Sequence, residues 1–438
     1  MKSKNSHISF LNLGQKEWQN LGLAAICQFG LIFWYFQLFH EEIFIGYGYD
    51  FLAFISAGKI INNFGFEKVY DLLTLAEVQQ KIHHILFVTA PAAFLPIFLV
   101  PFQVLALFEP KFGFLFWTGI NLITYVVYFY YIFLRSVNSQ HRRRLILIIA
   151  TSYSFLITLQ AGQVNVFLVI CVGEFIRYYF KNKPFQSGLW LGGLLLKPQI
   201  LVLIVPFLIL QKAWRTIGGF SLSLIGLSAT SLLLGGWSTI KSLLSLWLNF
   251  AVGIPTNNPG NMMNWRMLGV RLSNLDKPFW GWIVVVLGMI ATFIVTIYLW
   301  KRSSQILNNF KFECSEKTWL WCVLGTLAAT CALTWHSHLH MGLILIPLIA
   351  YLYSIGDLKD RWLNLWLFLP YGTLLFSFII GTVLKNPYIM SAGNLGGFLV
   401  GLCGLFINLL FLFIAFHRVK NIKKYLNNKF KSPTKLVL

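Results

Sequence analysis

Charged side chains are scarce in this 438-residue chain, where Asp, Glu, Lys and Arg make up only 11% of the residues. Soluble globular proteins carry about 25% charged residues, so the composition excludes an ordinary water-soluble fold. Hydrophobic residues account for 57% of the chain. Apolar runs of about 18–22 residues recur along it, each long enough to cross the hydrocarbon core as a helix. Because a backbone in lipid must satisfy its own hydrogen bonds, we expect an all-α polytopic membrane protein.

The chain also lacks the common motifs of soluble enzymes. It has no P-loop, no G-x-G-x-x-G, no DxD and no HExxH. Without a cradle for nucleotide phosphates, neither a nucleotide-sugar donor nor ATP-driven transport is expected. The six cysteines include no CxxC pair, so neither a disulfide framework nor a cysteine metal site is indicated. We predict no cofactor.

Acidic residues are few, with 14 Asp and Glu against 35 Lys and Arg, and the net charge is +21. In a soluble protein this excess would suggest binding to nucleic acid. In a membrane protein it follows from the positive-inside rule, which concentrates Lys and Arg in cytoplasmic loops. We therefore predict no nucleic-acid partner and a multi-pass protein with both termini in the cytoplasm, surrounded by membrane lipids.

The apolar runs predict roughly twelve transmembrane helices. One run, 85–108, breaks this pattern, because Pro91, Pro96 and Pro101 interrupt its helical hydrogen bonding. We expect it to be re-entrant or to lie in the outer interface. Residues 40–112 then form one large outer loop that carries interfacial and re-entrant helices.

The rest of the chain follows from the same orientation. A second outer loop is expected at 237–278, and a basic cytoplasmic tail at 417–438. No internal repeat and no low-complexity linker divides the sequence. We predict a single transmembrane domain over 1–438.

A carboxylate follows the first predicted crossing. Asp50 lies in a loop rich in glycine and aromatic residues, just before a segment, 51–64, with apolar residues at helical spacing. Held at the membrane surface, this carboxylate could act as a general base. The alternative is a solvated loop acid or a helix cap, because Asp is favoured before a first helical turn. Asp71 is expected to cap the helix that begins near Leu72, and it is kept as a candidate substrate contact.

Polar residues at the outer ends of later segments are candidates for substrate binding. Lys197 ends an apolar stretch with no acid nearby, and a cation inside the bilayer costs about 2.5–3.5 kcal/mol on insertion scales. It either reaches to the interface or meets a lipid phosphate. Gln163 and Asn165 lie in a turn between two predicted crossings, either as an ordinary polar turn or as substrate ligands.

Two arginines and three histidines complete the candidates. Arg266 and Arg271 lie in the second outer loop, against the positive-inside bias, so they indicate an anionic partner or pairing with headgroups. His336, His338 and His340 lie at the outer junction of two predicted crossings. On a helix, residues two apart are separated by about 200°, so only His336 and His340 would share a face. No acid follows, so we predict histidines that hydrogen-bond or carry protons beside a sugar or phosphate, and no metal site.

The order of these motifs resembles glycosyltransferase family 87, a bacterial group of polyprenyl-phosphate-sugar-dependent α-mannosyltransferases within the GT-C superfamily. The matching elements run through most of the chain. They are the segment from Asp50 to Asp71, the proline-rich stretch from Pro91 to Pro101, Trp117 and Asn121, the turn from Gly162 to Asn165, the glycine-rich hairpin from Gly188 to Pro198, and the Trp/His cluster before Pro347.

The resemblance implies a GT-C-like helix bundle and an inverting transferase at the outer face of the bacterial inner membrane. It implies a polyprenyl-phosphate sugar donor, with mannose taken from the family, and a glycolipid or glycan acceptor. Asp50 would be the catalytic base, and Lys197, helped by Arg266 or a histidine, would stabilise the departing phosphate. These groups would have to meet at one site facing the outer leaflet.

Two other classes of function stay open from the residues alone. The first is a transporter or lipid flippase, although such proteins usually show repeats and ionisable groups near the membrane midplane. The second is a non-catalytic partner in polysaccharide assembly.

Overall fold

The computed structural model describes residues 49–82, 89–136, 142–252, 262–273, 277–309, 312–384 and 395–431. Every regular element in these ranges is helical, which confirms the all-α prediction for this part of the chain. The first predicted crossing, near residues 20–39, lies outside the described residues.

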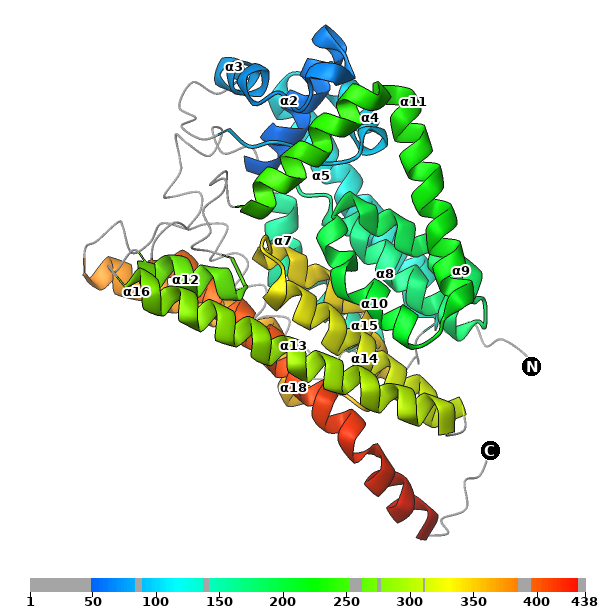
Figure 1. Cartoon of the computed structure of the whole chain (residues 1–438). Coiled ribbons are helices and arrows are strands. Elements are labelled where there is room, and N and C mark those ends of the chain that lie inside the picture. Colours follow the sequence, from blue (N-terminus) through cyan, green and yellow to red (C-terminus); the bar gives the residue numbers. More distant parts are fainter. Residues whose placement is uncertain are drawn as a thin grey trace.

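A cap of short helices closes one end of the molecule, at the top of Figure 1. It consists of α2 (Tyr49–Phe64), α3 (Leu72–Ile82) and α4 (Pro96–Leu105). The first turns of α2 are buried on every side, since residues 51–57 are all buried. An amphipathic interfacial helix would show one apolar face, so α2 is more enclosed by protein than its sequence spacing suggested.

The proline-rich run forms an extended stretch followed by a short helix. After residues 89–95, α4 contains only 10 residues and is about 15 Å long at 1.5 Å per residue. It is too short to cross a bilayer, as the prolines predicted. Its expected re-entrant position in the membrane stays a prediction.

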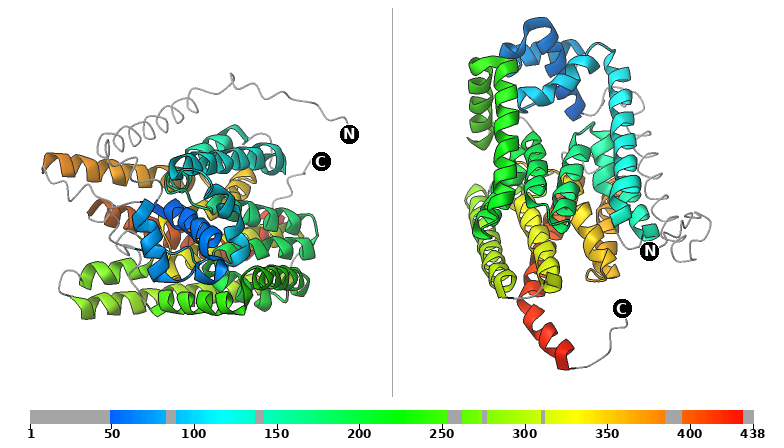
Figure 2. Two further views of the ribbon diagram at one scale, coloured as in Figure 1. Left: turned by 90° about the horizontal axis from the view of Figure 1, so that it is seen from above. Right: turned by 90° about the vertical axis from the view of Figure 1, so that its right-hand side faces the viewer.

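Two long helices join the cap to the rest of the molecule (Figure 2, right). One is α5 (Pro110–Val127) and the other is α11 (Trp214–Val252). Gly236 interrupts α11 with φ 73° and ψ 176°, a conformation that glycine adopts without steric cost. The helix therefore bends over α4 (Figure 1), and residues 237–252, predicted as the start of an outer loop, are helical.

A central group of helices and short 3-10 turns lies below the cap. Its elements are η2 (Tyr128–Phe133, a π-helix), α6 (Arg142–Thr151), α7 (Tyr153–Gln160), α8 (Asn165–Phe180), α9 (Pro184–Gly192), η5 (Gly193–Leu196), η6 (Pro198–Ile200), α10 (Leu201–Leu210), α14 (Phe312–Leu333), η8 (Leu339–Leu345) and α15 (Ile346–Ser354). Two further 3-10 turns are η1 (Phe66–Lys68) and η3 (Leu134–Ser136). The largest hydrophobic cluster of the described residues contains side chains from these helices and from the cap.

The remaining helices form a layer on one side of this group (Figure 1). They are α12 (Trp265–Ser273), α13 (Pro278–Asn309), α16 (Asp360–Val383) and α18 (Leu395–Lys431). The tail predicted from residue 417 begins as a continuation of α18, which runs to Lys431.

Five helices of the described residues are long and apolar enough to cross a membrane. They span Pro110–Phe133, Trp214–Asn249, Pro278–Ile306, Asp360–Gly381 and Gly396–Asn421. The predicted number of about twelve crossings is not confirmed, because several apolar runs are divided into short helices. The division between η5 and η6 at Lys197, where a proline follows, is one example.

Candidate active site

The turn before α8 packs directly against the start of α2. The backbone N–H of Phe51 donates to the carbonyl oxygen of Ala161 at 3.1 Å. Gly162 has a φ of +66°, and a Cβ added there would lie 2.6 Å from Phe51 Cβ. Only glycine fits this contact, which brings the turn that carries Gln163 beside Asp50.

Helix α5 holds this turn from the other side. The indole Nε1 of Trp117 donates to the Gly162 carbonyl oxygen at 2.8 Å, and its ring stacks on Phe167 with centroids 5.7 Å apart. Asn121, one turn further along α5, donates to the Trp117 carbonyl oxygen at 3.0 Å. The Trp-x-x-x-Asn element therefore supports the turn.

Lys197 lies at the break between η5 and η6, with φ −138° and ψ 81°. Pro198 prevents the helix from continuing, and the side chain is only 8% exposed. The Lys197 Nζ is 2.8 Å from Gln163 Oε1 and 3.3 Å from His340 Nε2. These partners are 34 and 143 residues away in the sequence, so the contacts are made by tertiary packing.

The hydrogen-bonding chemistry of Lys197 fixes two further assignments. An ammonium has three donors and no acceptor, so Nε2 of His340 must accept and the ring is neutral. Two of the three donors are then used by Gln163 and His340. No third acceptor for Nζ is found among the described residues, so one N–H remains to bind a substrate oxygen.

Asp50 completes this group at the first turn of α2. Its carboxylate hydrogen-bonds with the Gln163 side chain and interacts electrostatically with Lys197. Burial raises the pKa of Asp50, and these two partners work against the rise. Burial likewise lowers the pKa of Lys197 to about 8, against the attraction of Asp50. A carboxylate in such an environment is a stronger base than one in water.

The three histidines follow α14. His336 and His338 lie on a backbone that is not helical, and His340 is the second residue of η8. His338 forms an isolated antiparallel bridge with Met262, and the N–H of Met263 donates to Ser337 O at 2.8 Å. The prediction that only the first and third histidines share a face assumed a helix and was wrong. Successive rings are close, with centroids 4.9 Å apart for His336 and His338.

The third ring is also close, with the centroids of His338 and His340 5.6 Å apart. Burial lowers the pKa of His336 to about 4, and Lys197 and Arg266 add to this effect. Both cations lie beside the histidine segment, because Lys197 contacts His340 and Arg266 contacts Trp335. Among the described residues, no group of three or more His, Cys, Asp and Glu has a metal-binding arrangement.

Arg266 reaches this segment from α12. Its guanidinium lies 4.6 Å from the Trp335 ring centroid and its NH1 atom is 3.4 Å from the Trp335 carbonyl oxygen. Arg271 lies elsewhere on α12, with its guanidinium 5.6 Å from the ring of Phe398 in α18. The structure therefore brings Arg266 to the histidines and orients Arg271 toward α18.

Asn264 positions Arg266, a role that the sequence reasoning missed. Its side-chain oxygen accepts from the Met267 N–H at 3.2 Å, and its Nδ2 donates to Thr334 O at 2.8 Å. It therefore caps α12 and ties it to the histidine segment. The sequence does contain a signal for this role. An Asn directly before a segment with apolar residues at helical spacing, here Trp265 onward, is typical of a helix start.

Asn165 and Asp71 have different surroundings. Asn165 begins α8 with 0% exposure, and its side-chain atoms have no hydrogen-bond partner among the described residues. Asp71 accepts from Thr74 at 2.8 Å and from the Leu73 N–H at 3.2 Å. It therefore caps α3, and no contact within the described residues joins it to Asp50 or Lys197.

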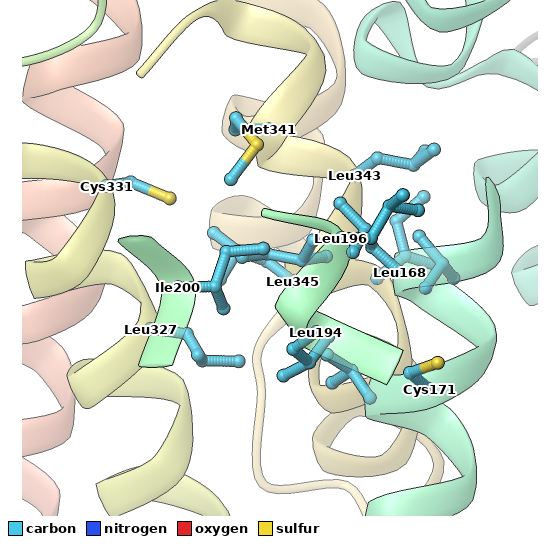
Figure 3. Close-up of a cluster of buried hydrophobic side chains, with 14 of the residues drawn as sticks. Leu168, Cys171, Leu194, Leu196, Ile200, Leu327, Cys331, Met341, Leu343 and Leu345 are labelled. Carbon is cyan, nitrogen blue, oxygen red and sulfur yellow. The ribbon is translucent and has the colours of Figure 1, made fainter. Parts of the chain in front are cut away.

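An apolar cluster lies where the elements of the site meet (Figure 3). Leu196 directly precedes Lys197, Met341 directly follows His340, and Leu168 lies one turn beyond Asn165. The side chains labelled in Figure 3 come from α8, η5, η6, η8 and α14. The elements that carry the polar groups therefore pack together through their apolar side chains.

The model of glycosyltransferase family 87 matches residues 95–315 of the chain. The match includes Gln163, Lys197 and Arg266 and excludes Asp50 and the histidines. No curated protein and no solved structure matches the chain.

Proposed function

The chain belongs to glycosyltransferase family 87, and from this we propose that it is an inverting transferase that uses a polyprenyl-phosphate sugar. The sugar is a hexose, in the first instance mannose. The acceptor is a hydroxyl of a glycolipid or glycan at the outer face of the bacterial inner membrane. The family itself makes the protein a glycosyltransferase, and its apolar helices place it in a membrane.

One observation carries this proposal. Asp50, near the N-terminus, and Lys197, in the middle of the chain, both contact Gln163, and Lys197 also contacts His340. A carboxylate with a raised pKa and an ammonium with a free N–H are the two groups that displacement at a sugar phosphate requires.

The reaction follows from these two groups. The acceptor hydroxyl oxygen attacks the anomeric carbon from the face opposite the phosphate, and its proton passes to Asp50. The bond between the anomeric carbon and the phosphate oxygen breaks, and the electron pair leaves with the polyprenyl phosphate. The Lys197 ammonium stabilises the charge on that oxygen. Because attack and departure occur on opposite faces, the anomeric configuration inverts.

The neighbouring groups support the same assignment. Arg266 is half-buried beside Trp335 and can bind a second phosphate oxygen. The neutral histidines can hydrogen-bond to sugar hydroxyls, because an uncharged imidazole both donates and accepts. Family membership does not favour the transporter or flippase alternative.

The proposal is tested with the full-length protein in membranes supplied with several radiolabelled polyprenyl-phosphate sugars. We expect one donor to be consumed by the wild-type protein, with the anomeric configuration inverted in the product. Asp50→Asn, which keeps the shape of the side chain, should abolish transfer. Asp360→Asn, at the start of α16, is the matched control. Normal turnover by the Asp50 variant would remove the mechanism.

A further inference from the structure

Gln163 stands between the two charged groups of the site. Its Oε1 is 2.8 Å from the Lys197 Nζ, and its side chain also hydrogen-bonds with Asp50. Because an ammonium only donates and a carboxylate only accepts, the oxygen of the amide must face Lys197 and its NH₂ must face Asp50. In the described part of the chain, Asp50 and Lys197 form no ion pair with each other.

The backbone at Gln163 is held from two sides. The Gln163 backbone N–H donates to Thr158 O at 2.9 Å, and the preceding carbonyl is held by Trp117. The side chain is buried, so water does not compete for its two hydrogen bonds. The backbone that carries this side chain is therefore anchored by α5 and α7, independently of the groups that the amide contacts.

We propose that Gln163 is a positioning residue that keeps the Asp50 carboxylate and the Lys197 ammonium at one site without allowing them to pair. This inference rests on the proposed function, which needs both groups. A direct ion pair would make the carboxylate a weaker base and would occupy the ammonium donor that the phosphate requires. With the amide between them, each group keeps an open position for a substrate.

Two substitutions of Gln163 distinguish a role in keeping Asp50 and Lys197 apart from a role in packing alone. Gln163→Glu keeps the shape but replaces the NH₂ that faces Asp50 with an oxygen, so two carboxyl groups must share the space. Gln163→Met keeps the volume and removes both hydrogen bonds. In both variants the Asp50 carboxylate loses the hydrogen bond from the Gln163 amide. In Gln163→Glu it also has a second carboxyl group beside it. The other titratable or charged groups near this site are the Lys197 ammonium, the three neutral histidines and the Arg266 guanidinium.

The experiment measures the pH dependence of kcat/KM in nanodiscs, with the polyprenyl-phosphate sugar that the wild-type protein consumes. We expect the acidic limb of the profile to move upward by about one pH unit or more in Gln163→Glu, and by less in Gln163→Met. The same change at Gln186, an exposed residue of α9, is the matched charge control. A packing role would reduce the rate without moving the limb.

A second measurement does not depend on turnover. Dicyclohexylcarbodiimide modifies protonated carboxyl groups, so the pH at which half of Asp50 is labelled reports its protonation by mass spectrometry. This midpoint should rise in the order wild type, Gln163→Met, Gln163→Glu. A midpoint that stays at the wild-type position in both variants would overturn the inference. If the wild-type protein consumes no such donor, the proposed function fails, while the labelling still decides the role of Gln163.

Discussion

Replacement of Lys197 by methionine tests the chemistry of the site most directly. Methionine is about as long as lysine and apolar, so it would fill most of the buried space that the Lys197 side chain occupies. The variant removes one buried charge and leaves Gln163 Oε1 and His340 Nε2 without their donor. Such unpaired atoms cost about 1–3 kcal/mol each in stability, which the loss of a desolvated cation offsets in part.

The effect on catalysis should be larger than the effect on folding. In the proposed reaction, the N–H of Lys197 that no described residue accepts is directed at charge that develops in the transition state. Loss of a donor of this kind lowers kcat by about 10²–10³-fold, or roughly 2.7–4 kcal/mol. We expect kcat and kcat/KM to fall together, because the interaction is made mainly in the transition state.

The pH profile gives an independent signature. Burial lowers the pKa of Lys197 to about 8, so wild-type activity should decline as the pH rises through about 8 and the ammonium loses its proton. In Lys197→Met this basic limb should be absent. The acidic limb should move upward, since the Lys197 charge no longer lowers the pKa of Asp50.

The assay measures the initial rate of sugar transfer in nanodiscs between about pH 5 and pH 9.5. This range is wide enough to show both the acidic and the basic limb of the pH profile. Lys183→Met, an exposed residue between α8 and α9, is the matched control. A basic limb that persists in Lys197→Met, or a kcat within a factor of two of the wild type, would refute the reasoning.

Three further predictions concern the scaffold of the site. Gly162→Ala should lower kcat by about tenfold or more while the protein stays folded, because the new Cβ would lie 2.6 Å from Phe51 Cβ. A displacement of about 1 Å in a catalytic group can lower the rate about 10²-fold. An unchanged kcat would contradict this prediction. Asn264→Ala should lower stability by about 0.5–2 kcal/mol through the lost cap of α12 and raise the donor KM as Arg266 loosens, as thermal unfolding and steady-state kinetics would show. Asp71→Ala should cost about 1 kcal/mol in stability as a lost cap, with kcat/KM of the folded protein unchanged; a large rise in KM would instead identify Asp71 as a substrate contact.

Several features follow from local properties of the sequence. The low charge and the long apolar runs are enough to predict a helical membrane protein, because a lipid environment leaves the backbone few alternatives. Pro91, Pro96 and Pro101 predicted a segment without a full crossing, since proline removes a backbone donor. The cap at Asp71 was equally local. These effects act within a few residues, so they can be predicted from the sequence.

Other features depended on packing between distant segments. The histidine segment was assigned helical spacing, but its backbone is extended where it pairs with Met262. Helix α11 continues past Gly236 into a predicted loop. Here the backbone conformation is set by its neighbours and by a single glycine, so the hydrophobic pattern alone could not give it.

The sequence by itself determined the kind of molecule and the residues with unusual chemistry, because composition and side-chain type are properties of single positions. Only the tertiary structure decided that Gln163 contacts both Asp50 and Lys197. It also decided that Lys197 contacts His340, which is 143 residues further along the chain. These contacts result from the positive φ of Gly162, the indole of Trp117 and the apolar layer beneath them. Each acts across elements that are far apart in the chain, and the energy that holds them together appears only when the helices pack.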